Sequence, residues 1–174
     1  MDATAPTAGH ADGRIAVFPG SFDPLTVAHL AVARAVVDQR GVSHVHLALS
    51  TTTLGKAHLD DSTLDRRVAA LRRRTREHDW LEVVVVEHSL VADIAQGYDV
   101  VVMGADKWAQ VNDAAWYGDD VTARDDALAR LPEVAVAPRV GHHVPDGLSL
   151  ELPAELAHVS ATAVRQGRTD WAAP

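Results

Sequence analysis

The sequence predicts a single α/β domain built on one open, mostly parallel sheet of five strands with helices on both faces. Its 174 residues are about the length of one domain. Five short apolar runs alternate with segments whose apolar residues recur at helical spacing, the order expected of parallel strands joined by helices. One of these runs, at residues 81–87, is nearly continuous in valine, which is typical of strands covered on both faces.

The first half of the chain supplies three of the predicted strands and three helices. Each strand is an apolar run that ends at turn-forming or polar residues, and the runs lie at 14–18, 44–50 and 81–87. A helix is predicted from Thr26, because its apolar residues share one face, and Gly41 is a typical C-terminal stop. Further helices are predicted over 62–78, with Ser62 as N-cap, and over 89–97.

The second half supplies the remaining strands and helices. Strands are predicted at 99–104 and 133–138, and helices at 121–130 and 160–167. Ser160 is the expected N-cap of the last helix and Gly167 its stop. In open parallel sheets ligands bind beyond the carboxyl ends of the strands. The loops after Phe18, Ser50, Gly104 and Pro138 are therefore where a site is expected.

No repeat, internal linker or low-complexity segment interrupts this pattern. Residues 14–174 are therefore expected to form the one domain, after a flexible tail over residues 1–13. The start of the chain lacks the basic and apolar regions of a secretory signal, and no apolar run approaches the ~18 residues of a membrane span. With no cysteine in the chain, these features lead us to expect a cytoplasmic protein without a membrane partner.

The charge of the chain limits its partners. A formal net charge of −8 argues against a general nucleic-acid surface, so no nucleic-acid partner is expected. An acidic protein can still bind phosphates, but only through a few focused donors. A chain that is 47% hydrophobic and 23% charged has ample apolar content for one core.

The stretch "PGSFDPLTVAH" at residues 19–29 contains candidate donors of this kind. Gly20 lets the backbone approach a ligand closely, and Ser21 and Phe22 offer amide N–H groups. His29 falls in the first turn of the predicted helix, where anions are favoured. The alternative is a plain turn before a capped helix whose histidine only packs.

Two motifs give this stretch a family resemblance. "GSFDPLTVAH" is similar to the signature G-[ST]-F-D-P followed by [HT]-x-G-H of the nucleotidylyltransferase superfamily, and "VSATAVR" at 159–165 resembles its [ST]-x-T-x-x-R motif, about 130 residues later. "DVVVMGADKW" and "NDAAWY" resemble segments of the nicotinate-nucleotide adenylyltransferases. The resemblance implies a Rossmann-like nucleotidylyltransferase fold for the predicted domain.

The implied activity is transfer of a nucleotidyl group, adenylyl in first place, from a nucleoside triphosphate such as ATP to a small phosphate monoester. Nicotinate mononucleotide is the first candidate acceptor, pyrophosphate is released, and Mg²⁺ arrives with the triphosphate rather than on protein ligands. Pantetheine-phosphate adenylyl transfer and cytidylyl transfer are alternatives. A non-catalytic nucleotide-binding protein is a further one, because Ala28 replaces the family's usual glycine and "STTTLGK" at 50–56 replaces its N-P-x-K stretch.

The resemblance also implies residue roles. Catalytic roles fall to His29, Thr26, Lys56 and Arg165. Nucleotide binding falls to Phe18, Gly20, Ser21, Phe22, His29, Gly104, Asp106, Ser160, Thr162 and Arg165, and acceptor binding to Lys56, Trp108 and Trp116, with Arg66 or Arg67 positioning the acceptor side. Three alternatives stay open: Asp106 as a helix cap, Trp116 as a core residue and Lys56 as a solvated lysine. The oligomeric state is not indicated.

Overall fold

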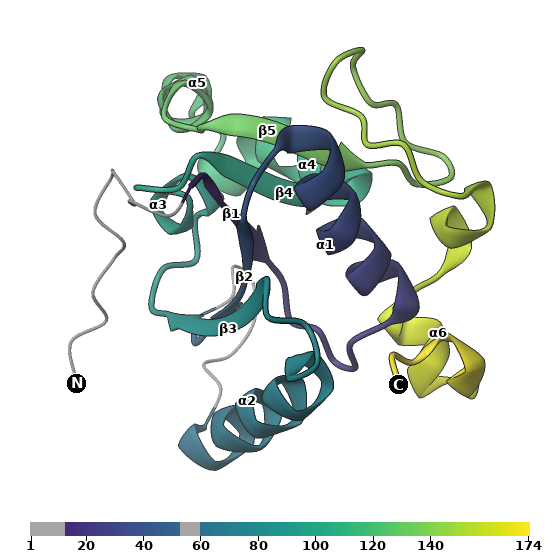
Figure 1. The fold of residues 1–174 in the computed structure, drawn as a ribbon. Coiled ribbons are helices and arrows are strands. Elements are labelled where there is room, and N and C mark those ends of the chain that lie inside the picture. The colour runs from purple at the N-terminus through teal and green to yellow at the C-terminus, as the bar shows by residue number, and fades with distance from the viewer. Residues whose placement is uncertain (1–12, 53–59) are drawn as a thin grey trace.

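A computed structural model of the chain describes residues 13–52 and 60–174. Five parallel strands form one sheet in the order β3-β2-β1-β4-β5 (Figure 1). The strands are β1 (Ile15–Pro19), β2 (His44–Ser50), β3 (Leu81–Val86), β4 (Val100–Gly104) and β5 (Glu133–Ala137). The predicted fold class is thereby confirmed, and every strand pair described is parallel rather than mostly so.

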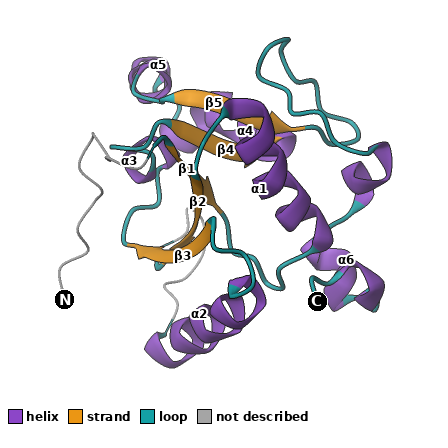
Figure 2. Cartoon of the chain, viewed as in Figure 1, coloured by secondary structure: helices purple, strands orange, loops and turns teal. Residues whose placement is uncertain are grey.

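The helices lie between and after these strands, as Figure 2 shows. The α-helices are α1 (Val27–Arg40), α2 (Asp61–Thr75), α3 (Val91–Ile94), α4 (Ala105–Asn112), α5 (Val121–Ala129) and α6 (Ala161–Arg165). Residues 13–52 and 60–174 also contain the 3₁₀ turns η1 (Ala114–Tyr117), η2 (Ala154–His158) and η3 (Thr169–Trp171). None of the helices described is both long and apolar enough to cross a membrane.

Strand β1 lies at the centre of the sheet, and the chain winds in opposite directions on its two sides. It pairs with β2 on one edge, through Ile15 opposite His44, and with β4 on the other, through Ala16 opposite Val100. The strand order therefore reverses between β1 and β4. At such a switch point the loops that leave the two strands diverge and open a crevice at their carboxyl ends.

Alternate residues of the strands face two separate cores. Ala16 and Phe18 of β1 belong to the core under α1 and α2, whereas Val17 between them belongs to the core under α3 and α4. Because the side-chain period of a strand is two residues, each strand buries apolar side chains on both faces. This is why the run at 81–87 is nearly continuous in valine rather than alternating between apolar and polar residues.

Helix boundaries are where the sequence predictions need correction. Helix α2 begins one residue earlier than predicted and ends at Thr75, and its N-cap is Asp60 rather than Ser62. The carboxylate of Asp60 accepts a hydrogen bond from the Thr63 amide, and the Ser62 hydroxyl donates to the same carboxylate. Asp60 and Ser62 can both cap a helix, and Asp60 is the cap here because its ionised carboxylate is the stronger hydrogen-bond acceptor.

Two further elements differ from the prediction. Helix α4 was not predicted. It has only eight residues, and its N-cap, Gly104, has no side-chain oxygen that would mark the start of a helix in the sequence. Helix α3 covers only Val91–Ile94 of the predicted 89–97. Gly41 and Ser160 have the capping positions expected of them, and Thr26, where the first helix was predicted to begin, is the N-cap of α1.

Candidate functional site

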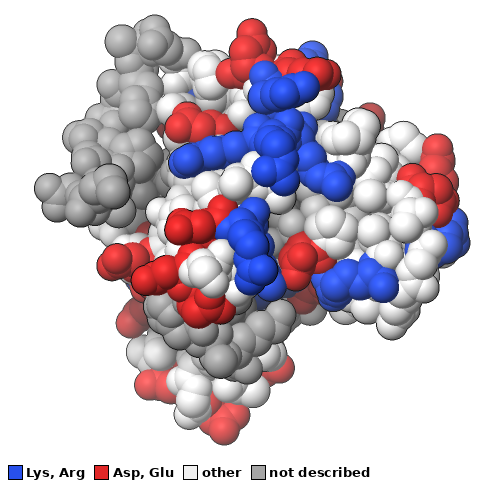
Figure 3. Space-filling view, turned by 90° about the horizontal axis from the view of Figure 1, so that it is seen from below, with Lys and Arg blue, Asp and Glu red and all other residues white. Residues whose placement is uncertain are grey.

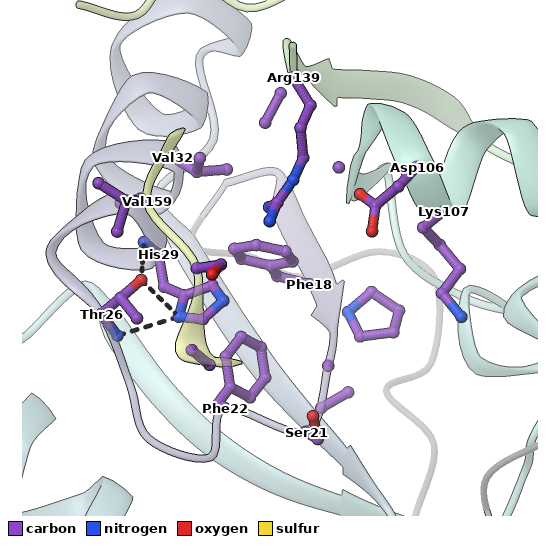
Figure 4. Close-up of a pocket in the computed structure, with 18 of the residues that line it drawn as sticks. Phe18, Ser21, Phe22, Thr26, His29, Val32, Asp106, Lys107, Arg139 and Val159 are labelled. Carbon is purple, nitrogen blue, oxygen red and sulfur yellow. Dashed lines mark hydrogen bonds between the residues drawn. The ribbon is translucent and has the colours of Figure 1, made fainter. Parts of the chain in front are cut away.

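A cavity of about 400 Å³ opens at the switch point, at the carboxyl ends of β1 and β4. Figure 4 shows side chains from several loops converging on it. Most of the predicted site residues line it: Phe18, Gly20, Ser21, Phe22, Thr26, His29, Gly104, Asp106 and Ser160. Segments at both ends of the chain thus contribute to one cavity.

The loop after β1 lines the cavity, and its conformation depends on a glycine. The Gly20 amide donates to the Ala48 carbonyl at 3.1 Å, which holds the loop against the end of β2. A Cβ atom at Gly20 would lie 2.8 Å from the Phe22 ring, so no other residue fits without displacing that ring. Phe22 itself has a positive φ of 45° and packs edge-on against Phe18, with ring centroids 5.3 Å apart.

His29 stands in the first turn of α1 with one ring nitrogen fully engaged. The Thr26 amide donates to His29 Nδ1 at 3.0 Å, and the Thr26 hydroxyl lies 3.0 Å from the same nitrogen. The His29 amide donates back to the Thr26 hydroxyl oxygen at 3.2 Å, which completes a capping box. An N–H can only donate, so Nδ1 accepts, and the proton of the neutral ring is on Nε2. Figure 4 shows that second nitrogen on the cavity side.

The surroundings of His29 keep it uncharged at neutral pH. Burial of the ring, together with the nearby positive charge of Arg139, lowers the pKa of His29 from 6.5 to about 4. The rings of Phe22 and Phe18 pack edge-on against it, at 5.1 and 6.0 Å between centroids. The residue therefore offers the cavity a neutral N–H donor, not a cation.

Positive charge in the cavity comes from Arg139, Lys107 and Arg67, with Asp106 as the one carboxylate among the described lining residues. The Arg67 guanidinium pairs with Asp23 at 3.0 Å, and Lys107 donates to Gln110 at 2.6 Å. Arg139 points toward His29 and Phe18 in Figure 4, and its guanidinium has no hydrogen bond or ion pair to any residue within 13–52 or 60–174. Sequence reasoning missed Arg139, although it directly follows Pro138, the end of the last predicted strand.

Outside the cavity, the cations are unevenly distributed. Figure 3 shows Lys and Arg side chains gathered in a band across the face seen from below, with acidic side chains around it. Exposed arginines of α2, among them Arg66 and Arg72, belong to the part of the molecule that lies lowest in Figure 1. A chain with a net charge of −8 thus still gathers positive side chains on one face.

The end of β4 presents Gly104 and Asp106 together. Gly104 is the N-cap of α4, so the alternative of Asp106 as a helix cap is not what the structure shows. A Cβ atom at Gly104 would lie 2.7 Å from Asp106 Oδ1. The Asp106 carboxylate can occupy its position only because residue 104 has no side chain. Asp106 is exposed and lines the cavity opposite His29 (Figure 4).

Of the residues in the second sequence motif, at 159–165, some line the cavity and others lie outside it. Ser160 lines the cavity and caps α6 by accepting from the Ala163 amide at 3.1 Å. Arg165 and Thr162 do not line the cavity: the Arg165 guanidinium donates to the Asp23 carbonyl and, at 3.1 Å, to the Thr162 hydroxyl. Arg165 therefore ties α6 to the loop after β1 rather than facing the cavity.

The predicted acceptor residues fall in three different places. Lys56 lies outside the described residues. Trp108 is not brought to the cavity; its partly buried ring packs against the core under α3 and α4. Trp116 is 43% exposed on η1, so the alternative of a core residue is wrong, and it lines a small depression. Ser89, Val91 and Lys107 line both this depression and the cavity.

Residues 17–167 match the sequence profile of the cytidylyltransferase-like family. The chain belongs to the cytidylyltransferase-like family. The predicted resemblance to nucleotidylyltransferases is thereby confirmed, and the cavity lies within the matched segment.

Two curated relatives of this cytidylyltransferase-like chain are phosphopantetheine adenylyltransferases. The one from Rhizorhabdus wittichii is 32% identical over 93 residues, which cover 52% of this chain and 53% of the relative. The one from Sphingopyxis alaskensis is 36% identical over 95 residues, which cover 52% of this chain and 52% of the relative. The match thus spans about half the length of these relatives. A solved structure of Plasmodium falciparum nicotinic acid mononucleotide adenylyltransferase complexed with NaAD has the same fold, with a TM-score of 0.62 at 10% identity over 88% of this chain and 83% of that one.

The depressed pKa of His29 makes the stability of the protein pH-dependent. Above pH 6.5 the ring is neutral in both folded and unfolded chains, so it contributes no pH dependence. Between pH 6.5 and about 4 only the unfolded chain takes up the proton. Unfolding free energy therefore falls by about 1.4 kcal/mol for each pH unit in that window.

Denaturant unfolding of wild type and His29→Gln at pH 7.0, 5.5 and 4.5 measures this effect. We expect His29→Gln to lose less stability on acidification than wild type, and His88→Gln, at an exposed histidine, to follow wild type. Equal pH dependence of His29→Gln and wild type would show that His29 is not held neutral.

Proposed function

We propose that this protein transfers an adenylyl group from ATP to a small phosphate monoester and releases pyrophosphate. The observation that carries the proposal is the cavity at the switch point. It is lined by a neutral N–H donor at His29, by the Gly20 loop, and by an Arg139 guanidinium that has no partner among the described residues. Donors of this kind, fixed before a ligand arrives, suit phosphate oxygens. The family membership and the adenylyltransferase relatives support the same activity.

The chemistry of this transfer makes few demands on acid or base groups. An oxygen of the acceptor phosphate attacks the α-phosphorus of ATP, and the bond from that phosphorus to the oxygen bridging to the β-phosphate breaks. Pyrophosphate leaves with the electron pair, and no proton has to move in this step. The acceptor phosphate is already an anion, so the protein has to align two polyanions and stabilise the charge of the transition state.

The described residues divide this work between position and charge. His29 Nε2–H donates to a phosphoryl oxygen, and the Gly20 loop and the first turn of α6 at Ser160 bring backbone N–H groups to the same cavity. Arg139 and Lys107 supply positive charge, and Asp106 accepts hydroxyl protons of the ribose. Neutral His29 suits a site that already has cations, because burying a further charge would cost desolvation energy.

A divalent cation fits this site as part of the triphosphate. No group of three or more His, Asp or Glu side chains is placed to hold a metal ion in the part of the chain that is described. Mg²⁺ usually keeps several waters and binds through one or two carboxylates together with substrate phosphates. Asp106 is the one described carboxylate at the cavity that could contribute to such an ion.

The acceptor has two candidates, each favoured by a different observation. Nicotinate mononucleotide is favoured by the exposed Trp116 ring in the depression that shares Ser89 and Lys107 with the cavity, because a planar ring can stack there. Phosphopantetheine is favoured by the names of the two curated relatives and by the apolar side chains Val91 and Ile94 on the same wall. We propose nicotinate mononucleotide as the first acceptor to test.

A pyrophosphate-release screen tests the proposed activity directly. ATP and CTP, each with Mg²⁺, are combined with nicotinate mononucleotide, phosphopantetheine and a ringless phosphate monoester. We expect turnover with ATP and one of the first two acceptors, and a loss of at least ~10²-fold in kcat for His29→Ala, the scale of a lost transition-state donor. Tight ATP binding without turnover with any acceptor would favour the non-catalytic alternative, for which the sequence features are Ala28, at the cavity, and the stretch at 50–56.

Arg139→Ala is expected to weaken ATP binding. The guanidinium has no partner among the described residues, so its removal leaves no carboxylate there without its ion pair. The variant therefore loses only the positive charge that would contact a bound ligand. A charge-assisted hydrogen bond contributes about 1.5–3 kcal/mol, so the Kd for ATP should rise roughly 10- to 150-fold by calorimetry. Arg130→Ala is the control, because Arg130 pairs with Asp93 away from the cavity. Unchanged ATP affinity in Arg139→Ala would remove this residue from the site.

Trp116→Ala is expected to act on the acceptor alone. Stacking on an aromatic ring contributes about 1–3 kcal/mol per base by alanine substitution, so KM for a ring-bearing acceptor should rise roughly 5- to 150-fold with KM for ATP nearly unchanged. Since Trp116 is 43% exposed, the variant should melt close to wild type. Equal losses for both substrates would contradict the stacking role. If the best acceptor has no ring, the proposal of nicotinate mononucleotide fails while that of adenylyl transfer remains.

A further inference from the structure

Thr26 makes more contacts with His29 than a helix cap requires. An N-cap threonine satisfies one or two amides of the first turn, and here the hydroxyl oxygen accepts from the His29 amide at 3.2 Å in that way. The side chain of His29 then returns to Thr26, with Nδ1 3.0 Å from the amide nitrogen and 3.0 Å from the hydroxyl. In a usual capping box a Glu or Gln side chain occupies this returning position.

The geometry specifies the hydrogens in this pair. The Thr26 hydroxyl oxygen already accepts from the His29 amide, which leaves its own hydrogen free to point at Nδ1. Two donors, one N–H and one O–H, thus converge on one ring nitrogen. A proton on Nδ1 would face both of them, so the Nδ1–H tautomer and the doubly protonated ring are disfavoured and the Nε2–H tautomer is favoured.

The pair is shielded from water by a segment far along the chain. Thr26 is only 1% exposed. It forms an antiparallel bridge with Ala172, and the Ala173 amide donates to the Leu25 carbonyl at 2.9 Å. Arg74 of α2 donates in turn to the Ala173 carbonyl. Because water cannot easily replace the Thr26 donors, the preference that they impose on His29 is not diluted by solvent.

We propose that Thr26 is a positioning residue whose amide and hydroxyl together hold His29 as a neutral Nε2–H donor aimed into the cavity. The catalytic role predicted for Thr26 from sequence is thereby replaced, because its hydroxyl is turned to His29 and is not offered to a substrate. The consequence for turnover depends on the proposed adenylyl transfer. The tautomer itself does not, and it can be measured in the isolated protein.

Nitrogen-15 NMR of histidine-labelled protein reads the tautomer. Thr26→Val removes the hydroxyl but keeps the shape and the amide, and Thr26→Ser keeps both donors. In wild type and Thr26→Ser we expect His29 Nδ1 to be unprotonated and Nε2 protonated at pH 7. In Thr26→Val only the amide still donates to Nδ1, so we expect the Nε2–H tautomer to stay the major one and a minor Nδ1–H population to become detectable. The control is Asp120→Ala, which removes the N-cap of α5, where the side chain accepts from the Thr122 and Ala123 amides.

The kinetic expectation separates positioning from binding. In Thr26→Val, kcat should fall about 5- to 10-fold, the scale of one lost hydrogen bond, while KM for ATP changes by less than about 2-fold. Thr26→Ser should restore kcat. Asp120→Ala should lower the melting temperature as much as Thr26→Val does, without changing either kcat or the His29 signals.

Two results would overturn the proposal. One is an unchanged His29 tautomer in folded Thr26→Val; the other, which needs no variant, is an Nδ1-protonated or doubly protonated His29 in wild type at pH 7. If the wild-type tautomer is as expected but the pyrophosphate screen shows no turnover, the proposed function fails while the positioning role of Thr26 stands.

Discussion

The pairing of β1 with β2 on one edge and β4 on the other is the constraint on which the site depends. With β1 fixed between them, the chain has to leave β1 and β4 in opposite directions, and the space between these exits cannot be filled by either crossover. The Gly20 amide, held by the Ala48 carbonyl at the end of β2, sets one side of that space. Helix α4, which begins directly at Gly104, sets the other.

Asp23 links this loop to the rest of the molecule. Its carboxylate pairs with Arg67 of α2, and its carbonyl accepts from Arg165 of α6. The sequence resemblance implies nucleotide binding for Arg165 and positioning of the acceptor side for Arg66 or Arg67. In the structure Arg165 and Arg67 are both engaged by the loop. The cation that remains unpaired among the described residues at the cavity is Arg139, which a chain of net charge −8 can use without a general excess of positive charge. Focused rather than distributed charge is what a small polyanion requires.

Family membership and acceptor choice rest on different parts of the chain. The family profile covers residues 17–167, and the switch-point cavity is built by the segments at both ends of that range. The depression that we propose for the acceptor is lined by Ser89, Val91 and Lys107 and by residues of η1, which joins α4 to α5. A segment on one wall can change without disturbing the sheet, which is how one fold accommodates acceptors as different as a pyridine nucleotide and a pantetheine chain.

The sequence by itself determined the five strands, the start of α1 near Thr26 with its stop at Gly41, and the loops in which a site had to lie. Apolar runs, capping residues and glycines could determine these because they act over a few neighbouring residues. The sequence could not rank Asp60 against Ser62 as the cap of α2, nor find α4, whose glycine cap has no side-chain signal. Only the tertiary structure decided which candidates face the cavity: His29 and Ser160 do, Arg165 and Trp108 do not, and Arg139 joins them. The reason is physical: the direction and charge state of a side chain depend on partners more than 100 residues away, as Thr26, buried against Ala172, illustrates.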